Sequence, residues 1–176
     1  MYKSGKVVAV LAANPALSSI LAAALATLPG LRVRRFESDI ALITYMRLSP
    51  VDVLVCDFDC EAAPAASLAR ALRVDDQVAR REFQIIALAS TVTENTKQAS
   101  VASGIDEIIL KPMSPKYLME RVVSRLSRVA AQVSAGAYQG PERRDRLPAG
   151  RPTVLPFDRQ RDNVVPLFKD QRLPFH

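Results

Sequence analysis

The sequence predicts a doubly wound α/β fold, in which a five-stranded parallel sheet is covered by helices on both faces. Five short apolar segments rich in valine, isoleucine and leucine alternate along the chain with five segments of helical composition. Neighbouring parallel strands need a crossover connection, and the intervening helices provide it. The chain has 176 residues, of which 49% are hydrophobic, enough for one domain with a packed core.

The first strand and helix follow directly from local composition. Val7–Leu11 is a continuous apolar run, which is typical of a strand buried on both faces. Asn14 can cap the following helix, and Pro15 suits its first position. The alanine- and leucine-rich segment 16–28 continues this helix, and residues 29–30, proline and glycine, stop it.

The next two strands differ in their expected exposure. Residues 31–36 alternate apolar and basic side chains, as expected of a half-exposed or edge strand. Ser38 or Asp39 can cap a second helix that runs to about Leu48, before a serine and a proline. Residues 51–56 form another apolar run, and we expect a buried strand there.

The second half continues the alternation. Residues 64–74 predict a helix, 83–89 a buried strand, and 94–102 a short polar helix that ends before Gly104. Glycine suits the left-handed conformation that ends many helices. Residues 106–110 predict the fifth strand.

The last predicted helix, residues 114–133, is amphipathic. Its apolar side chains recur at three- and four-residue spacing on one face: Leu118, Val122, Leu126 and Val129. This face is expected to pack on the sheet or to mediate a homodimer.

Composition limits the classes of function. The net charge of +6 is spread along the chain, and residues 139–176 hold eight basic against five acidic residues, so nucleic-acid binding is not favoured. Two cysteines and a single histidine do not suggest a disulfide framework or a zinc site. No apolar run is long enough to cross a membrane, and we expect a cytoplasmic protein.

The chain is expected to divide into a folded domain, residues 1–134, and a flexible tail, residues 135–176, rich in proline and arginine. Six of the twelve prolines lie between residues 141 and 174, among charged residues that cannot form a core. Proline–phenylalanine–charge clusters recur at 155–162 and 165–172. They are interpreted either as short docking motifs or as biased composition without function.

Polar side chains follow three of the predicted strands. Asp57, Ser90 and Lys111 come just after strand ends, and the carboxyl ends of parallel strands meet at one edge of the sheet. We therefore expect these three residues to lie close together, although they are far apart in the sequence.

The alternation, the segment SPVDVLVCD that ends at Asp57, and GIDEIILKPMSP around Lys111 and Pro112 resemble the CheY-like receiver domains of bacterial response regulators. The resemblance covers roughly residues 5–130 and implies the flavodoxin-like (βα)5 fold. It implies that Asp57 is the phosphoacceptor, that Lys111 contacts the phosphate, and that Pro112 follows a cis peptide bond. A magnesium ion normally neutralises the remaining charge.

Three hallmark positions depart from this pattern. Ala12 and Ala13 stand where the acidic, metal-binding pair is expected, and Ile108 replaces the switch aromatic. The phosphate-tracking hydroxyl aligns with Ala89, and Ser90 follows one residue later.

Asp57 and Asp59 are then the remaining side-chain oxygens for a metal, so we expect weak Mg²⁺ binding at most and otherwise no cofactor. For Asp57 two interpretations remain: it is an inefficient phosphoacceptor, or it is a relic that pairs with Lys111. Asp59 is either a solvent-exposed turn residue or a substitute metal ligand.

We therefore expect a stand-alone, degenerate receiver-like protein, not an enzyme, that acts by protein–protein interaction. The resemblance implies a histidine kinase, a phosphotransferase or another receiver as its partner. One alternative is a fully phosphorylatable response regulator. Another is binding of a cyclic dinucleotide such as c-di-GMP by the tail, through Tyr138, Arg143, Arg144, Arg146 and Arg151. The competing interpretation of these arginines is a solubilising segment.

Overall fold

The computed structural model describes residues 5–59, 64–135 and 164–165. The strands, in chain order, are β1 (Lys6–Leu11), β2 (Leu31–Phe36), β3 (Val53–Asp57), β4 (Gln84–Ala89), β5 (Glu107–Leu110) and β6 (Val164–Val165). The helices are α1 (Pro15–Ala26), α2 (Asp39–Leu48), α3 (Ala65–Val74), α4 (Glu94–Ser103) and α5 (Pro115–Ala135).

The strands form one sheet in the order β2-β1-β3-β4-β5-β6. The first five are parallel, as the sequence predicts, and their register brings the carboxyl ends to one edge. Leu11 lies beside Cys56, Asp57 beside Leu88, and Ala89 beside Leu110. The residues that follow these strand ends are thereby gathered at one place.

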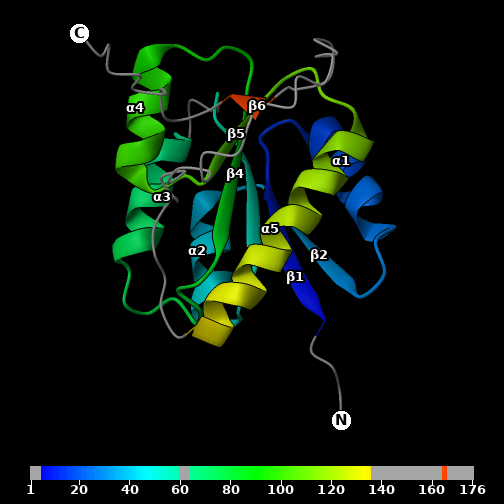
Figure 1. The fold of residues 1–176 in the computed structure, drawn as a ribbon, viewed down its shortest axis with the longest axis vertical. Coiled ribbons are helices and arrows are strands. Elements are labelled where there is room, and N and C mark those ends of the chain that lie inside the picture. The colour runs from blue at the N-terminus through cyan, green and yellow to red at the C-terminus, as the bar shows by residue number, and fades with distance from the viewer. Residues whose placement is uncertain (1–4, 60–63, 136–163, 166–176) are drawn as a thin grey trace, which may run out of the picture.

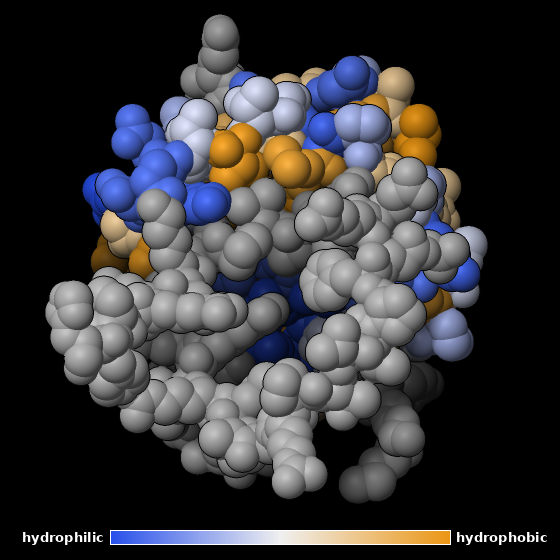
Figure 2. Space-filling model, turned by 45° about the horizontal axis from the view of Figure 1, so that its top comes forward, coloured by the Kyte–Doolittle hydropathy of each residue, from blue (hydrophilic) through white to orange (hydrophobic). Residues whose placement is uncertain are grey.

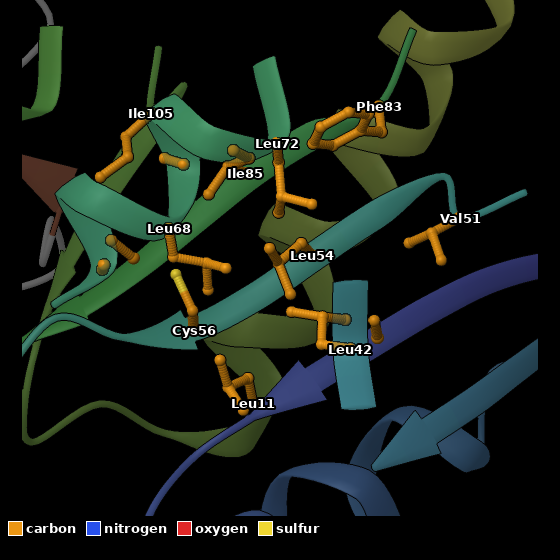
Figure 3. Packing of buried hydrophobic residues seen from close by; sticks show 14 of the residues in the cluster. Leu11, Leu42, Val51, Leu54, Cys56, Leu68, Leu72, Phe83, Ile85 and Ile105 are labelled. Carbon is orange, nitrogen blue, oxygen red and sulfur yellow. The ribbon is translucent and has the colours of Figure 1, made fainter. Parts of the chain in front are cut away.

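Helices cover both faces of the sheet, with α1 and α5 on one face and α2, α3 and α4 on the other (Figure 1). Two layers of buried apolar side chains result, because successive residues of a strand point to opposite faces. One layer lies between the sheet and the α2–α3 side, where Leu54, Cys56 and Leu68 pack together (Figure 3). The other joins β-strand valines to Leu21 and Leu25 of α1 and to Leu118 of α5.

Local signals in the sequence fix several helix ends. The Asn14 side chain accepts hydrogen bonds from the backbone N–H groups of Ala16 and Leu17, and Ser38 caps α2. Gly104 ends α4 with a φ of 80°, in the left-handed region that glycine tolerates.

All five predicted parallel strands are present, and the described residues add a sixth, short strand that the sequence does not predict. Val164 and Val165 form β6, which pairs antiparallel with β5, although the sequence pattern places them in a tail without regular structure. Their hydrogen-bond partners come from β5 and not from neighbours in sequence. The remainder of the predicted tail beyond Ala135 lies outside the described residues.

The apolar face of α5 is used inside the fold. Leu118, Val122 and Val129 are fully buried, and Leu126 is partly buried against the same core layer. Because these side chains pack on the sheet, a homodimer through α5 would have to use its other residues, and dimerisation stays a prediction.

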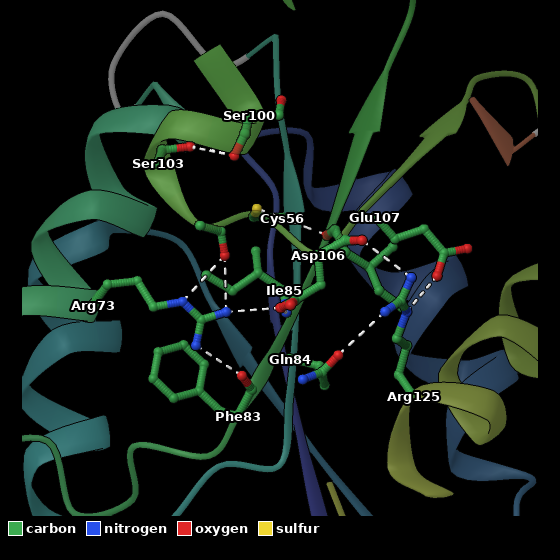
Figure 4. A network of polar contacts seen from close by, with 12 residues as sticks. Cys56, Arg73, Phe83, Gln84, Ile85, Ser100, Ser103, Asp106, Glu107 and Arg125 are labelled. Atoms are coloured by element: carbon green, nitrogen blue, oxygen red, sulfur yellow. Dashed lines mark hydrogen bonds and ion pairs between the residues drawn. The ribbon is translucent and has the colours of Figure 1, made fainter. Parts of the chain in front are cut away.

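A charged network is buried at the amino end of β5 (Figure 4). The Glu107 carboxylate, 1% exposed, accepts hydrogen bonds from the Nε atoms of Arg121 and Arg125, each at 2.5 Å. Arg125 also donates to Gln84 Oε1 and to the backbone oxygen of Asp106. These contacts tie α5 to the two last parallel strands, and the sequence pattern does not reveal them.

A third arginine ties α3 to the start of β5. Arg73 donates to the Asp106 carboxylate at 2.7 Å and to the backbone oxygens of Phe83 and Gly104, while its guanidinium lies over the Phe83 ring. Burial and pairing of this kind leave little freedom for the loop between α4 and β5.

Candidate functional site

The candidate site lies at the carboxyl edge of the sheet, where β3 and β5 end. Asp57 is the last residue of β3, and Lys111 directly follows β5. The Lys111 ammonium donates a hydrogen bond to Asp57 Oδ1 at 2.8 Å, with both side chains mostly buried. The ion pair between these two residues, expected from the sequence, is thus confirmed.

Asp59 joins this pair and makes it a cluster of three charges. Its Oδ2 atom lies 3.0 Å from the Lys111 ammonium and accepts a hydrogen bond from the Ser90 backbone N–H at 2.7 Å. The backbone N–H of Asp59 in turn donates to Asp57 Oδ1 at 3.1 Å. Asp59 is exposed and lies in a turn, as expected, but its carboxylate is not simply solvated: it binds two donors of the site.

The electrostatics of the cluster agree with its geometry. Partial burial alone would raise the pKa of Asp59, but hydrogen bonds from Ser90 and Lys111 and the charge of Lys111 outweigh it, so the pKa lies below its usual value of 3.8. Burial alone would lower the pKa of Lys111, but Asp57 and Asp59 outweigh it and raise the pKa above 10.5. Both shifts favour the ionised cluster.

These shifts predict a pH window for the cluster. A carboxylate with a lowered pKa contributes stability that is present above 3.8 and is lost as the pH falls through its folded-state pKa. A lysine with a raised pKa contributes stability that is present below pH 10.5 and is lost as the pH rises through the folded-state pKa of this lysine. We expect an NMR titration to give Asp59 a midpoint below 3.8 that moves up in Lys111→Met.

The matched control for this titration is Lys116→Met, at an exposed position near the start of α5. It removes a lysine close in sequence to Lys111 without touching the site, and the Asp59 midpoint should stay in place. An Asp59 midpoint that ignores Lys111→Met would mean that the two side chains do not interact in solution.

The alanines at the end of β1 stand beside this cluster. Since Leu11 pairs with Cys56, Ala12 lies next to Asp57, and Ala13 one residue beyond. Ala12 is buried and Ala13 is exposed, and neither offers an oxygen from its side chain.

The residues present do not fit a magnesium ion. Mg²⁺ requires several oxygen ligands in near-octahedral geometry. Asp57 and Asp59 already share the Lys111 ammonium, and within residues 5–59, 64–135 and 164–165 there is no cluster of three or more metal-ligating side chains. The lysine supplies the positive charge between these carboxylates.

The other hallmark positions lie where the resemblance places them, without the expected groups. Ala89 is fully buried at the end of β4, and Ser90 is exposed and contributes its backbone N–H and a side-chain hydrogen bond to Asp59. Ile108 is fully buried in the core. The peptide bond between Lys111 and Pro112 is cis.

Cys56 precedes Asp57, and its thiol donates a weak hydrogen bond to the backbone oxygen of Ile86 at 3.8 Å. It is buried, and burial together with the neighbouring Asp57 charge raises the pKa of its thiol to about 12. A thiol in this state is not a nucleophile near neutral pH. Packing explains its presence (Figure 3).

The remaining sequence-based candidates lie outside the described residues. These are the tail residues considered for nucleotide binding or docking: Tyr138, Arg143, Arg144, Arg146 and Arg151. Among the helices that the structure does describe, none combines the length and the hydropathy that crossing a membrane requires.

The end of the molecule at which β6 lies has a mixed surface. Figure 2 turns the top of Figure 1 toward the viewer and shows strongly hydrophilic residues near the centre of this face, with hydrophobic residues above them. The described residues that are visible in this view thus include both hydrophilic and hydrophobic side chains.

Comparison with known proteins finds likeness in structure. No protein-family model matches the sequence, and no curated protein does. A CheY-like receiver domain protein from Methanospirillum hungatei is similar with a TM-score of 0.64 and 15% identity, over 72% of this chain and 98% of that one. A putative response regulator from Chloroflexus aurantiacus gives 0.62 and 21%, over 70% and 98%.

A response regulator from Thermotoga maritima is similar with a TM-score of 0.59 and 23% identity, over 69% of this chain and 98% of that one. Each match spans nearly the whole of the known domain. At these identities the likeness is one of fold, and it agrees with the strand order and the parallel register described above. The chain therefore has the receiver-domain fold of the response regulators.

Proposed function

We propose that this chain is a cytoplasmic signalling protein of the two-component or phosphorelay type, which acts by binding another protein and does not depend on phosphorylation of Asp57. The fold supports a response-regulator-like role, and the partner class is a histidine kinase, a phosphotransferase or another receiver. The chain is a binding module and not an enzyme.

One observation carries the proposal: the donors that a phosphoryl group on Asp57 would need are already bound to Asp59. A phosphoryl group at this position requires positive charge and N–H donors close to Asp57. The Asp59 N–H already donates to Asp57 Oδ1, while the Lys111 ammonium and the Ser90 N–H both contact Asp59 Oδ2, at 3.0 and 2.7 Å. Asp59 is a built-in anion beside Asp57.

The alanines strengthen the same conclusion. A carboxylate that attacks a phosphoryl group brings two anions together, and charge stabilisation is usually the largest catalytic term. Ala12 and Ala13 cannot hold the cation that would offset this repulsion. The site retains the ionised side chains that hold the loops after β3, β4 and β5 together. It lacks the acidic, metal-binding pair that would favour transfer of a phosphoryl group to Asp57.

The Asp59 carboxylate and the Lys111 ammonium hold the site in one arrangement. Lys111 is tied to both carboxylates, and Ile108, in place of a switch aromatic, is fully buried in the core. A module of this kind presents a constant surface to its partner. In the resembling family that surface is formed by the counterparts of α4, β5 and α5.

The test is the amide NMR spectrum of the full chain before and after addition of acetyl phosphate and Mg²⁺. We expect the Ser90 and Lys111 signals, and those of α4, β5 and α5, to remain unchanged, because Lys111 and the Ser90 N–H are already bound to the carboxylates of the site. A Mg²⁺-dependent shift across these elements that disappears in Asp57→Ala would show a working phosphorylation switch and overturn the proposal.

A further inference from the structure

The outer face of α2 carries two of the three most exposed large apolar side chains in the described part of the chain. Ile40 is 73% exposed and Leu48 is 79% exposed, whereas Leu42 and Met46, on the opposite face of the helix, are buried in the core. Ile40 and Leu48 lie two turns apart with Thr44 between them, so about 12 Å separates them along the helix axis. They form a short apolar ridge on the surface.

Two arginines of β2 point to the same face of the sheet as α2. Phe36, the last residue of β2, packs against the core layer on the α2–α3 side, and its ring centroid lies 5.2 Å from that of Tyr45 in α2. Because side chains alternate between the two faces of a strand, Arg34 and Arg32 share the face of Phe36. β2 is the outermost strand at this edge of the sheet and contacts α2. The two arginines therefore lie beside α2 at the rim of the sheet.

The charges of these two arginines are not neutralised within the described residues. Both side chains are exposed, and neither belongs to an ion pair in this part of the chain. Glu37 and Asp39 are the acids closest to them in sequence, at the end of β2 and the start of α2, and do not pair with them. Arg47, in the last turn of α2, contrasts with both because it binds Asp75 at 2.8 Å. The rim of β2 thus offers positive charge to a partner.

The α2–β2 surface consists of Arg32, Arg34, Ile40 and Leu48, and its occupant has to provide apolar side chains and negative charge. A second copy of the chain has the same arginines and a net charge of +6, so a symmetric contact through this surface brings like charges together. Residues 139–176 of the chain itself hold eight basic against five acidic residues and do not complement it either. An acidic segment of a different protein does.

We propose that the α2–β2 surface is a docking site for an acidic amphipathic helix of a partner protein. The helix lies along α2 and packs two apolar side chains, about two turns apart, against Ile40 and Leu48. Its carboxylates bind the guanidinium groups of Arg32 and Arg34. A helix is favoured over an added strand because charged side chains on an edge strand oppose pairing with another strand.

The inference rests on the proposed function, since it names a surface through which the same module binds a protein. The α2–β2 surface is separate from α4, β5 and α5 and from the charged cluster at Asp57. The two failures are therefore read at different residues. Failure of the inference is read at α2 and β2 without acetyl phosphate, and failure of the proposed function at Ser90 and Lys111 after its addition.

The experiment measures binding of a labelled helical peptide to the full-length chain. The peptide has about 20 residues, enough for an alanine-rich helix in water, with leucines on one face and glutamates on both flanks. One matched peptide replaces every glutamate by lysine, and another replaces every leucine by serine. Amide shifts of the chain locate the bound peptide.

Two variants of the chain test the two halves of the surface. Arg32→Glu with Arg34→Glu reverses its charge, and Ile40→Ser with Leu48→Ser removes its apolar ridge. The matched controls are exposed residues of the helices on the other face of the sheet: Lys116→Glu in α5 and Ile20→Ser in α1. All four substituted positions of the surface are exposed, so the amide spectra should show an intact fold.

We expect the glutamate peptide to bind the wild type with shifts in α2 and β2, and the charge-reversed chain to bind it about tenfold more weakly at low salt. This difference should shrink at high salt, because the contacts are exposed. The ridge variant should bind weakly at either salt, and both controls should bind as the wild type does.

An outcome of any of three kinds overturns the proposal. The first is that the glutamate peptide does not bind, or binds no better than the lysine or serine peptide. The second is that the charge-reversed and ridge variants bind as the controls do, or that the shifts lie outside α2 and β2. The third is that a DNA duplex binds at Arg32 and Arg34 more tightly than the glutamate peptide, which would assign the surface to nucleic acid.

Discussion

Replacing Glu107 by alanine is expected to lower the free energy of unfolding by about 3–5 kcal/mol, the range found when one partner of a buried ion pair is removed. The carboxylate is 1% exposed and holds Arg121 and Arg125 through hydrogen bonds of 2.5 Å. Without it, the guanidinium of the buried Arg125 loses its counter-ion and a cavity is left under α5. A loss of this size is a large fraction of a typical domain's stability.

The measurement is chemical denaturation followed by circular dichroism. The matched control is Glu120→Ala, an exposed glutamate of α5, for which we expect a change within about 0.5 kcal/mol. If Glu107→Ala does not fold, Glu107→Gln is the second variant, because it keeps the shape and some of the hydrogen bonds. A Glu107→Ala chain as stable as Glu120→Ala would contradict the role given to this network.

The strands and helices were predictable where local pattern and tertiary structure agree. The apolar runs that became β1, β3 and β4 are buried on both faces, and the caps at Asn14 and Gly104 lie where the sequence places them. The strand β6 was not predictable, because two valines among prolines and charges carry no periodic signal. Its pairing is decided by the open edge of β5.

The position of the site in the fold was predictable, but the hydrogen bonds between its residues were not. Asp57 and Lys111 follow apolar strands of a parallel sheet, so their meeting follows from topology. The contact of Asp59 with Ser90 N–H depends on how the turn after β3 folds back, which no spacing in the sequence expresses. Arg121 and Arg125 lie four residues apart on the amphipathic helix, a spacing that places them on the same side of it. Nothing in this spacing identifies their partner, Glu107, which lies at the start of a strand.

The double variant Ala13→Asp with Asp59→Asn is expected to gain phosphorylation that the wild type lacks. Ala13 is exposed and near Asp57, so an aspartate there adds a metal ligand without burying a charge. The side-chain amide that replaces the Asp59 carboxylate carries no charge, so its oxygen holds the Ser90 N–H and Lys111 less strongly, and a phosphoryl group can compete for them. The phosphoryl group passes from acetyl phosphate to an Asp57 carboxylate oxygen, acetate leaves, and the adduct is read by intact-mass spectrometry.

The decisive comparison is the phosphorylated fraction of the wild type and of the Ala13→Asp/Asp59→Asn chain, incubated side by side with acetyl phosphate and Mg²⁺. We predict no adduct on the wild type and an acid-labile adduct on the double variant, which is lost when Asp57→Ala is added or Mg²⁺ is omitted. Each single variant should fall between them. Equal phosphorylation of the two chains, high or low, would contradict the claim that Asp59 and the alanines keep Asp57 from accepting a phosphoryl group.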